Sequence, residues 1–196
     1  RWKVSPLIKC AELINGDRSS NYPSGGDLVD SGVLFLNTKN ITKGRLDYDK
    51  STFITQEKFD SLGGGKLVRD DLVITMRGTL GSCALFDGPF ETGFINAQLM
   101  IIRCNNSLKP LFLHSLLTSE VIHRKFREMS RGAAVPQLTG AQMKELAVIC
   151  PPEELQDKFL GIREKTFSTL GKMNEVCCAD LFESLSQKAF AGQLSV

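Results

Sequence analysis

The sequence predicts an α+β protein: a twisted, mostly antiparallel or mixed sheet with short helices, followed by one long C-terminal helix. Three observations predict this class. Short apolar runs, such as 32–37 and 71–76, are bounded by turn-forming residues, which is typical of buried strands. From Pro110 onward, apolar residues recur at helical spacing. After Pro151-Pro152 this spacing continues almost to the end of the chain.

The first part of the chain alternates apolar segments with polar loops. Residues 2–13 are rich in apolar side chains and predict a strand or a short helix. Residues 16–26 are polar and full of turn formers. Residues 32–37 predict a buried strand, and 38–45 predict a second polar loop. The pattern favours a sheet whose connections are exposed.

The middle of the chain continues this pattern. Residues 55–62 predict a short helix that ends at the triple glycine 63–65. Residues 71–76 give the strongest strand prediction, and they end at a glycine-rich turn. Further strands are predicted at 82–86 and 98–104.

The helical pattern begins at Pro110. Residues 110–129 predict one helix with a basic C-terminal end, which suits the helix dipole. His114 lies on its apolar stripe and is expected in the core, whereas His123 is expected at the surface. Residues 147–150 predict a last strand before the double proline.

A long helix is predicted to start at Pro151-Pro152, where acidic residues suit the N-terminal dipole. We therefore divide the chain into a domain, 1–150, and a helix, 151–196. A helix of this length more often pairs with another long helix, although it can also fold back on its own domain. The residues expected to form the pairing stripe are Leu155, Phe159, Ile162, Leu170, Met173, Leu181 and Leu185.

Composition limits the class of protein. The 196 residues are 42% hydrophobic and 23% charged, as in ordinary globular proteins. There is no apolar run of the roughly 20 residues that a membrane span requires, and the N-terminus does not resemble a signal peptide. The chain starts with Arg1 instead of Met, so we expect a fragment or a trimmed chain. The net charge of +2 hides a basic excess in 1–150, because 151–196 has five basic and seven acidic residues.

The cysteines and glycines suggest no catalytic or cofactor site. The six cysteines include no Cys-x-x-Cys pair, and free thiols in a reducing cytoplasm are expected. The Ser61–Lys66 segment lacks the spacing of a phosphate-binding loop, and no dinucleotide motif is present. No metal or cofactor is therefore expected. A Cys–His enzyme remains a minor alternative, because such pairs form only in the folded protein.

Several loops combine a cationic side chain with amide or hydroxyl groups. Such groups bind phosphates and the edges of bases, although polar loops are often only solvated. We predict contacts with double-stranded DNA from Arg18, Ser20, Asn21, Lys39, Asn40, Lys43, Arg45, Arg77, Thr79, Arg131 and Gln137.

Four segments carry a family resemblance. Gly132–Leu138 has the form Gly-x-x-Val-Pro-x-Leu, and 143–148 has the spacing of a short strand that follows it. Pro-Pro-x-x-x-Gln occurs at 151–156, and 181–194 has the form Leu-x-x-Ser-Leu-x-x-x-Ala-Phe-x-Gly-x-Leu. With these motifs the chain resembles the specificity subunits of type I restriction–modification systems, over nearly its whole length.

The resemblance implies one target-recognition domain and one conserved-region helix. Complete subunits of the family have two of each, and their helices pack as an antiparallel coiled coil. The chain would therefore be part of a longer subunit or a half-subunit that dimerises. Leu155-Gln156 stands where the family usually has Glu-Gln, so the amide is kept.

The resemblance also implies a function. The domain would recognise one half of a bipartite DNA target, and the helix would act as a spacer and a docking site for methylation subunits. Restriction subunits would join through these, and the chain itself would not be an enzyme. The alternative is a non-enzymatic protein–protein adaptor that acts through its long helix.

Overall fold

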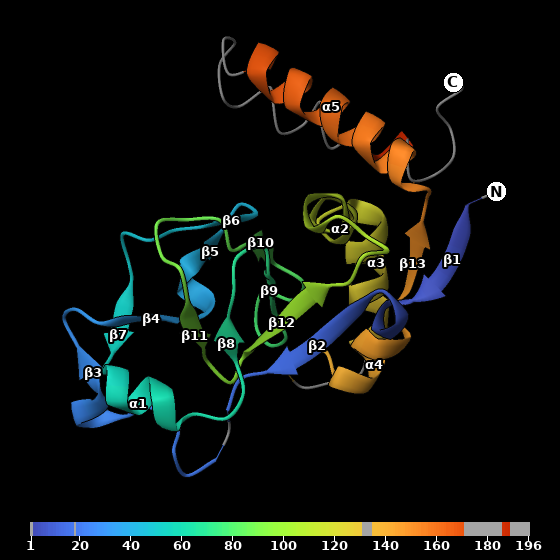
Figure 1. Ribbon diagram of the computed structural model, residues 1–196. Coiled ribbons are helices and arrows are strands. Elements are labelled where there is room, and N and C mark those ends of the chain that lie inside the picture. The colour runs from blue at the N-terminus through green and yellow to red at the C-terminus, as the bar shows by residue number, and fades with distance from the viewer. Residues whose placement is uncertain (1, 18, 131–134, 171–185, 189–196) are drawn as a thin grey trace.

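The computed structural model describes residues 2–17, 19–130, 135–170 and 186–188. Two larger sheets and two small ladders are flanked by helices (Figure 1). One sheet is antiparallel and the other is mixed. This arrangement confirms the α+β class and the mixed sheet that the sequence predicted.

A four-stranded antiparallel sheet lies at the centre of the domain. Its order is β10 (Cys83–Leu85), β9 (Leu72–Thr75), β12 (Leu99–Cys104) and β2 (Ala11–Asn15). Along β9, Ile74 contributes to the core beneath the helices, whereas Val73 contributes to the core between the two sheets. Because both faces of β9 and β12 are covered, these strands consist of continuous apolar runs, which the sequence shows clearly.

A buried ion pair joins the two central strands. Asp71, which precedes β9 and is only 1% exposed, accepts two hydrogen bonds from Arg103 of β12, each 2.8 Å long. The backbone N–H of Val68 donates to the same carboxylate at 2.8 Å. A charge buried at this depth requires such partners, so the pair fixes where β9 begins.

The second sheet has five short strands, of which β4 and β11 are parallel. Its order is β3 (Leu28–Val29), β7 (Thr52–Ile54), β4 (Val33–Leu36), β11 (Gly93–Ile95) and β8 (Lys66–Leu67). Helix α1 (Gln56–Ser61) covers its outer face, where Phe59 joins the stacked rings of Phe35 and Phe94. The sequence predicted β4 and α1, whereas the shorter strands depend on partners that are distant in sequence.

Helices α2 (Pro110–Leu117), α3 (Glu120–Met129) and α4 (Gly140–Glu145) contribute to the core on the other face of the four-stranded sheet. The prediction of one helix over 110–129 was wrong. The helix is interrupted at Ser119, which adopts extended dihedrals before α3, while the hydroxyl of Thr118 donates to the carbonyl of His114 at the end of α2.

Two small ladders complete the sheets, and short 3₁₀ turns connect several strands. Strand β1 (Lys3–Pro6) pairs antiparallel with β13 (Ala147–Cys150), so the first and last strands of the domain lie side by side (Figure 1). Strands β5 (Ile41–Thr42) and β6 (Arg45–Leu46) form a tight hairpin. The 3₁₀ turns are η1 (Leu7–Lys9), η2 (Gly25–Asp27) and η3 (Thr38–Asn40).

Helix α5 (Glu153–Leu170) follows the double proline and lies across α2 on the outside of the domain (Figure 1). The ring of Phe159 packs edge-on against Phe112 of α2, with 5.4 Å between the ring centres. The assignment of Phe159 to a pairing stripe is therefore corrected, because this ring faces its own domain. Leu155 is half-buried, whereas Ile162 is 64% exposed.

The long continuous helix is not shown. The described part of α5 has 18 residues, and a further helical turn is described at 186–188. The side chains of Leu170, Met173, Leu181 and Leu185 lie outside the described part of the chain. Among the described residues, no helix has the length and apolar character needed to cross a membrane.

Candidate nucleic-acid interface

The loop after β9 presents Arg77 and Thr79 on a rigid turn. The buried hydroxyl of Thr75 donates to the carbonyl of Thr79 and accepts from the N–H of Ser82. Gly81 has a φ of 74°, and a Cβ atom there would lie 2.3 Å from the ring of Phe126. Only glycine fits this turn, so its shape is set by the core below it.

The same loop is joined to residues 135–139, which precede α4. Arg77 and Gln137 form an isolated β-bridge, and the N–H of Leu138 donates to the carbonyl of Met76 at 2.8 Å. The guanidinium of Arg77 donates to the side-chain carbonyl of Gln137 at 2.9 Å. Two predicted DNA contacts, 60 residues apart, are thereby brought together.

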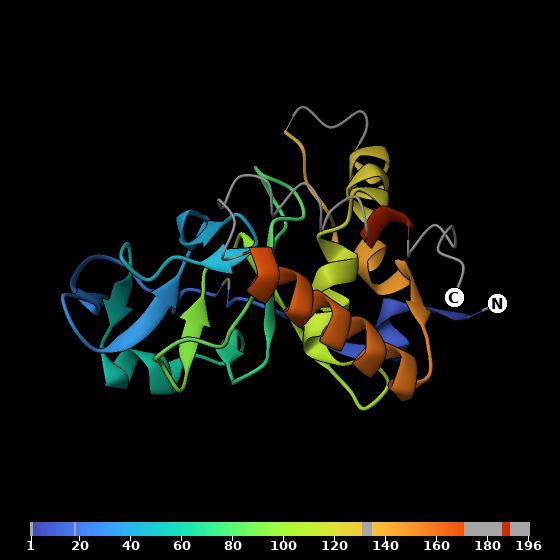
Figure 2. The same ribbon diagram turned by 90° about the horizontal axis from the view of Figure 1, so that it is seen from above.

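Residues 135–139, which carry Gln137, lead directly into an anchored helix start. Thr139 caps α4 in a capping box with Gln142, whose amide also donates to the carbonyl of Met129 at 2.8 Å. Gln142 therefore ties the start of α4 to the end of α3. In Figure 2 residues 135–139, the loop after β9 and the C-terminal end of α3 share one side of the molecule, the upper side of the view.

A hollow of about 530 Å³ lies beside the Arg77–Gln137 pair. The exposed side chains at its mouth are polar, because Asn15, Gln98 and Thr139 line it together with the pair. Gln98 was not among the residues predicted from the sequence to contact DNA. Its position depends on the N–H of Met76 donating to its carbonyl at 2.8 Å, a contact for which local sequence gives no signal.

The first polar loop reaches the edge of the same hollow. Tyr22 hydrogen-bonds the backbone of Ala97, which lines the hollow, and burial raises the pKa of the Tyr22 phenol. Ser20 and Asn21 are exposed directly before it. Arg18 and Arg131, two further predicted contacts, lie outside the described residues.

The prediction that Asn40 contacts DNA is wrong. Its side chain is 0% exposed, and its amide donates to the carbonyls of Asp47 and Lys50 at 3.1 and 3.3 Å. Its oxygen accepts from the N–H of Asn37 at 2.9 Å. All three bonds stabilise the turn after β4, so Asn40 is not available to DNA.

The remaining predicted cations do not join the Arg77–Gln137 pair. Lys39, Lys43 and Arg45 are exposed. Lys43 and Arg45 flank the β5–β6 turn, and the carbonyl of Gly44 in this turn lies 3.0 Å from His114 Nε2 in α2. Burial, with Arg45 nearby, lowers the pKa of Arg163 in α5. The hairpin therefore lies beside α2 and α5.

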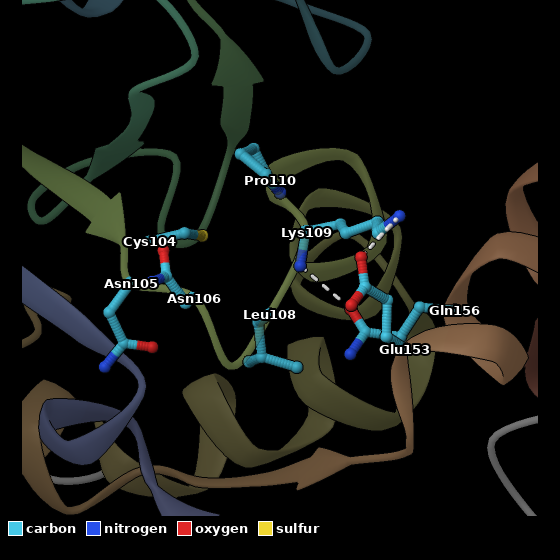
Figure 3. Close-up of a pocket in the computed structure, with 8 residues that line it drawn as sticks. All are labelled: Cys104, Asn105, Asn106, Leu108, Lys109, Pro110, Glu153 and Gln156. Atoms are coloured by element: carbon cyan, nitrogen blue, oxygen red, sulfur yellow. Dashed lines mark hydrogen bonds and ion pairs between the residues drawn. The ribbon is translucent and has the colours of Figure 1, made fainter.

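The junction with α5 centres on one buried amide. Gln156, 2% exposed, accepts from the N–H of Lys109 at 2.8 Å and donates to the carbonyls of Ser107 and Pro151, each at 3.0 Å. The ammonium of Lys109 pairs with Glu153 at 3.2 Å (Figure 3) and also with Asp157. These groups border a hollow of about 520 Å³ and join the start of α5 to the start of α2.

The described residues include no candidate metal site. Across the described ranges, no group of three His, Cys, Asp or Glu side chains is placed to hold an ion. Cys83 is buried and Cys104 is half-buried, and desolvation raises the pKa of the Cys104 thiol to about 12. Such a thiol stays protonated at neutral pH and is a poor nucleophile.

Comparison with known sequence families matches residues 11–176 to the Type I restriction modification DNA specificity domain. The chain belongs to this family. Members of the type I specificity family are non-catalytic components of restriction–modification complexes, as the resemblance implied. The matched region contains both Arg77 and Gln137 and extends into α5.

Individual relatives agree with this assignment. The EcoBI specificity subunit of Escherichia coli is 23% identical over 93% of this chain, which spans 40% of that protein. The HsdS subunit of Thermoanaerobacter tengcongensis has a similar fold, with a TM-score of 0.61, 18% identity, and coverage of 98% of this chain and 46% of that one.

A chain from a study of the assembly and conformational transition of the type I restriction–modification system has a TM-score of 0.67 and 17% identity. It covers 98% of this chain, which again spans 46% of that chain. The chain therefore spans less than half the length of the specificity subunits that it matches.

Proposed function

We propose that this domain recognises one half of a bipartite double-stranded DNA target within a type I restriction–modification complex. The observation that carries the proposal is the family match over 11–176 together with the polar face around Arg77 and Gln137. Specific readers present amide and guanidinium groups from a rigid scaffold, because such groups match base edges and phosphates. The loop after β9 and the segment before α4 have this character.

The helix completes the proposal. Helix α5 and its continuation would hold two recognition domains at a fixed separation and would dock the methylation subunits, through which restriction subunits join. The contacts of Gln156 and Phe159 support this role, because they set the direction in which α5 leaves the domain. Fixed geometry between two DNA-reading units determines the spacing of their half-sites.

The test is DNA binding by the chain assembled with the methylation subunits of its own restriction–modification system. We expect Arg77→Ala and Arg131→Ala to weaken specific binding about 5- to 100-fold in low salt, with folding unchanged. Arg69→Ala is the matched control, because Arg69 is exposed before the start of β9, whereas Arg77 follows its end. Unaltered affinity in both Arg77→Ala and Arg131→Ala would refute the loop assignment, and a complex that selects no sequence would refute the function.

A further inference from the structure

The bond between Arg77 and Gln137 changes what each side chain can recognise. Gln137 Oε1 already accepts from Arg77 Nη2 at 2.9 Å. A glutamine recognises adenine with both ends of its amide, because it accepts from the adenine N6 amino group and donates to N7. Its oxygen already accepts from Arg77, so Gln137 presents its NH₂ group and only one remaining lone pair, and an adenine amino group would have to share that oxygen with Arg77.

The exposed part of the pair consists mainly of hydrogen-bond donors. A guanidinium has five N–H donors and no acceptor, so Arg77 keeps donors beyond the one that faces Gln137. Both residues are exposed at the mouth of the hollow. In the major groove, guanine presents two adjacent acceptors, O6 and N7, whereas adenine presents one acceptor and one donor. A surface made mainly of donors complements the two acceptors of guanine better than the acceptor and donor of adenine.

The pair is also held in place before DNA arrives. The β-bridge between residues 77 and 137 and the bond from Leu138 N–H to the Met76 carbonyl fix the two backbones. Thr75 fixes the turn below Arg77. A guanidinium that is already oriented loses less conformational freedom on binding, which favours discrimination over general attraction.

We infer that Arg77 contacts a guanine through O6 and N7 in the half-site that this domain recognises, and that Gln137 is the positioning residue that orients it. The inference rests on the proposed function and deepens it by naming the base. It assigns different roles to two side chains that the sequence alone could not separate.

The experiment selects duplexes from a random-sequence library with the assembled complex and compares the enriched motifs. The wild-type motif should contain a guanine at which Arg77→Ala loses about 10- to 100-fold of its discrimination, with the other positions retained. Gln137→Met removes the acceptor and should relax the same position in part. Gln137→Glu keeps an acceptor for Arg77 and should preserve the preference.

Base analogues provide the second readout. Replacing that guanine with 7-deazaguanine removes N7, and should weaken binding of the wild type but leave Arg77→Ala unchanged. Arg77→Ala could instead lower the binding affinity equally for all sequences and reduce the slope of log affinity against log salt by about one. That result would identify a phosphate contact and overturn the inference. An unchanged motif in Arg77→Ala overturns it too. Only a wild-type complex that selects no sequence would also remove the proposed function.

Discussion

His114 is enclosed between two backbone carbonyls. Its Nε2 lies 3.0 Å from the carbonyl oxygen of Gly44 and 3.1 Å from that of Cys83. Both oxygens are acceptors, so Nε2 carries the proton, while Nδ1 is buried without a partner among the described residues. Burial, aided by Arg163, lowers the pKa of His114 below its ordinary value of 6.5. This buried position confirms the core location that the sequence predicted for His114.

The lowered pKa predicts a pH-dependent stability. Below about pH 6.5, His114 binds a proton in the unfolded chain but not in the folded chain, so acid favours unfolding. The free energy of unfolding should therefore fall as the pH drops from 7 to 5, until the folded pKa is passed. His114→Gln keeps an N–H donor but does not titrate, and should show a shallower fall in urea titrations. Equal slopes in both proteins would contradict this account.

Residue types alone did not separate exposed from structural polar groups. Asn40 and Gln137 both lie in polar loops beside cations, and the sequence analysis gave them the same role. The fold buries Asn40 in a turn and exposes Gln137 beside Arg77. This difference depends on which loops the distant strands bring together, and no local pattern contains that information.

Among the elements, those covered on both faces were predicted best. The buried runs of β4, β9 and β12 have a strong local signal. Two-residue strands such as β3 and β8 exist only through pairing with remote partners, so they gave none. Helix α4 was missed although the spacing of Thr139 and Gln142 fits a capping box, which is a local signal.

The junction between domain and helix depends on Gln156. Gln156→Leu would leave the N–H of Lys109 and two carbonyls without partners in a buried position. We expect a loss of about 2 kcal/mol in the free energy of unfolding, measured by urea denaturation. Gln56→Leu is the matched control, because Gln56 is exposed in the first turn of α1. If both variants unfold alike, the buried amide does not stabilise the junction.

At the scale of the whole molecule, the exposed side of α5 bears on the proposed pairing with a second helix. Ile162 is 64% exposed, although it lies on the apolar stripe that the sequence predicts. Leu155 and Phe159 on the same stripe are partly covered by the domain. The apolar stripe therefore contacts the domain near the start of α5 and is exposed to solvent at Ile162. This change supports the proposal that the continuation of α5 pairs with another helix, in the same chain or in a second copy.

Sedimentation can test the pairing. Ile162→Asp and Leu181→Asp should lower the mass of the wild-type assembly toward that of a single chain, because a charge in an apolar seam is costly. Ser168→Asp adds the same charge on the opposite face of α5, by helix geometry, and should leave the mass unchanged. Identical masses for wild type and both stripe variants would exclude pairing of isolated chains.

The pairing of β1 with β13 has a consequence for how such proteins diversify. The chain enters the domain along β1 and leaves it along β13, and these strands are antiparallel neighbours from Lys3–Cys150 to Pro6–Ala147. The intervening part of the chain therefore begins and ends at one short β-ladder. A different recognition unit that begins at β1 and ends at β13 would leave the direction of α5 unchanged as long as it keeps the α2 partners of Gln156 and Phe159. Under the proposed function, the recognised DNA sequence could then change while the helix keeps its place.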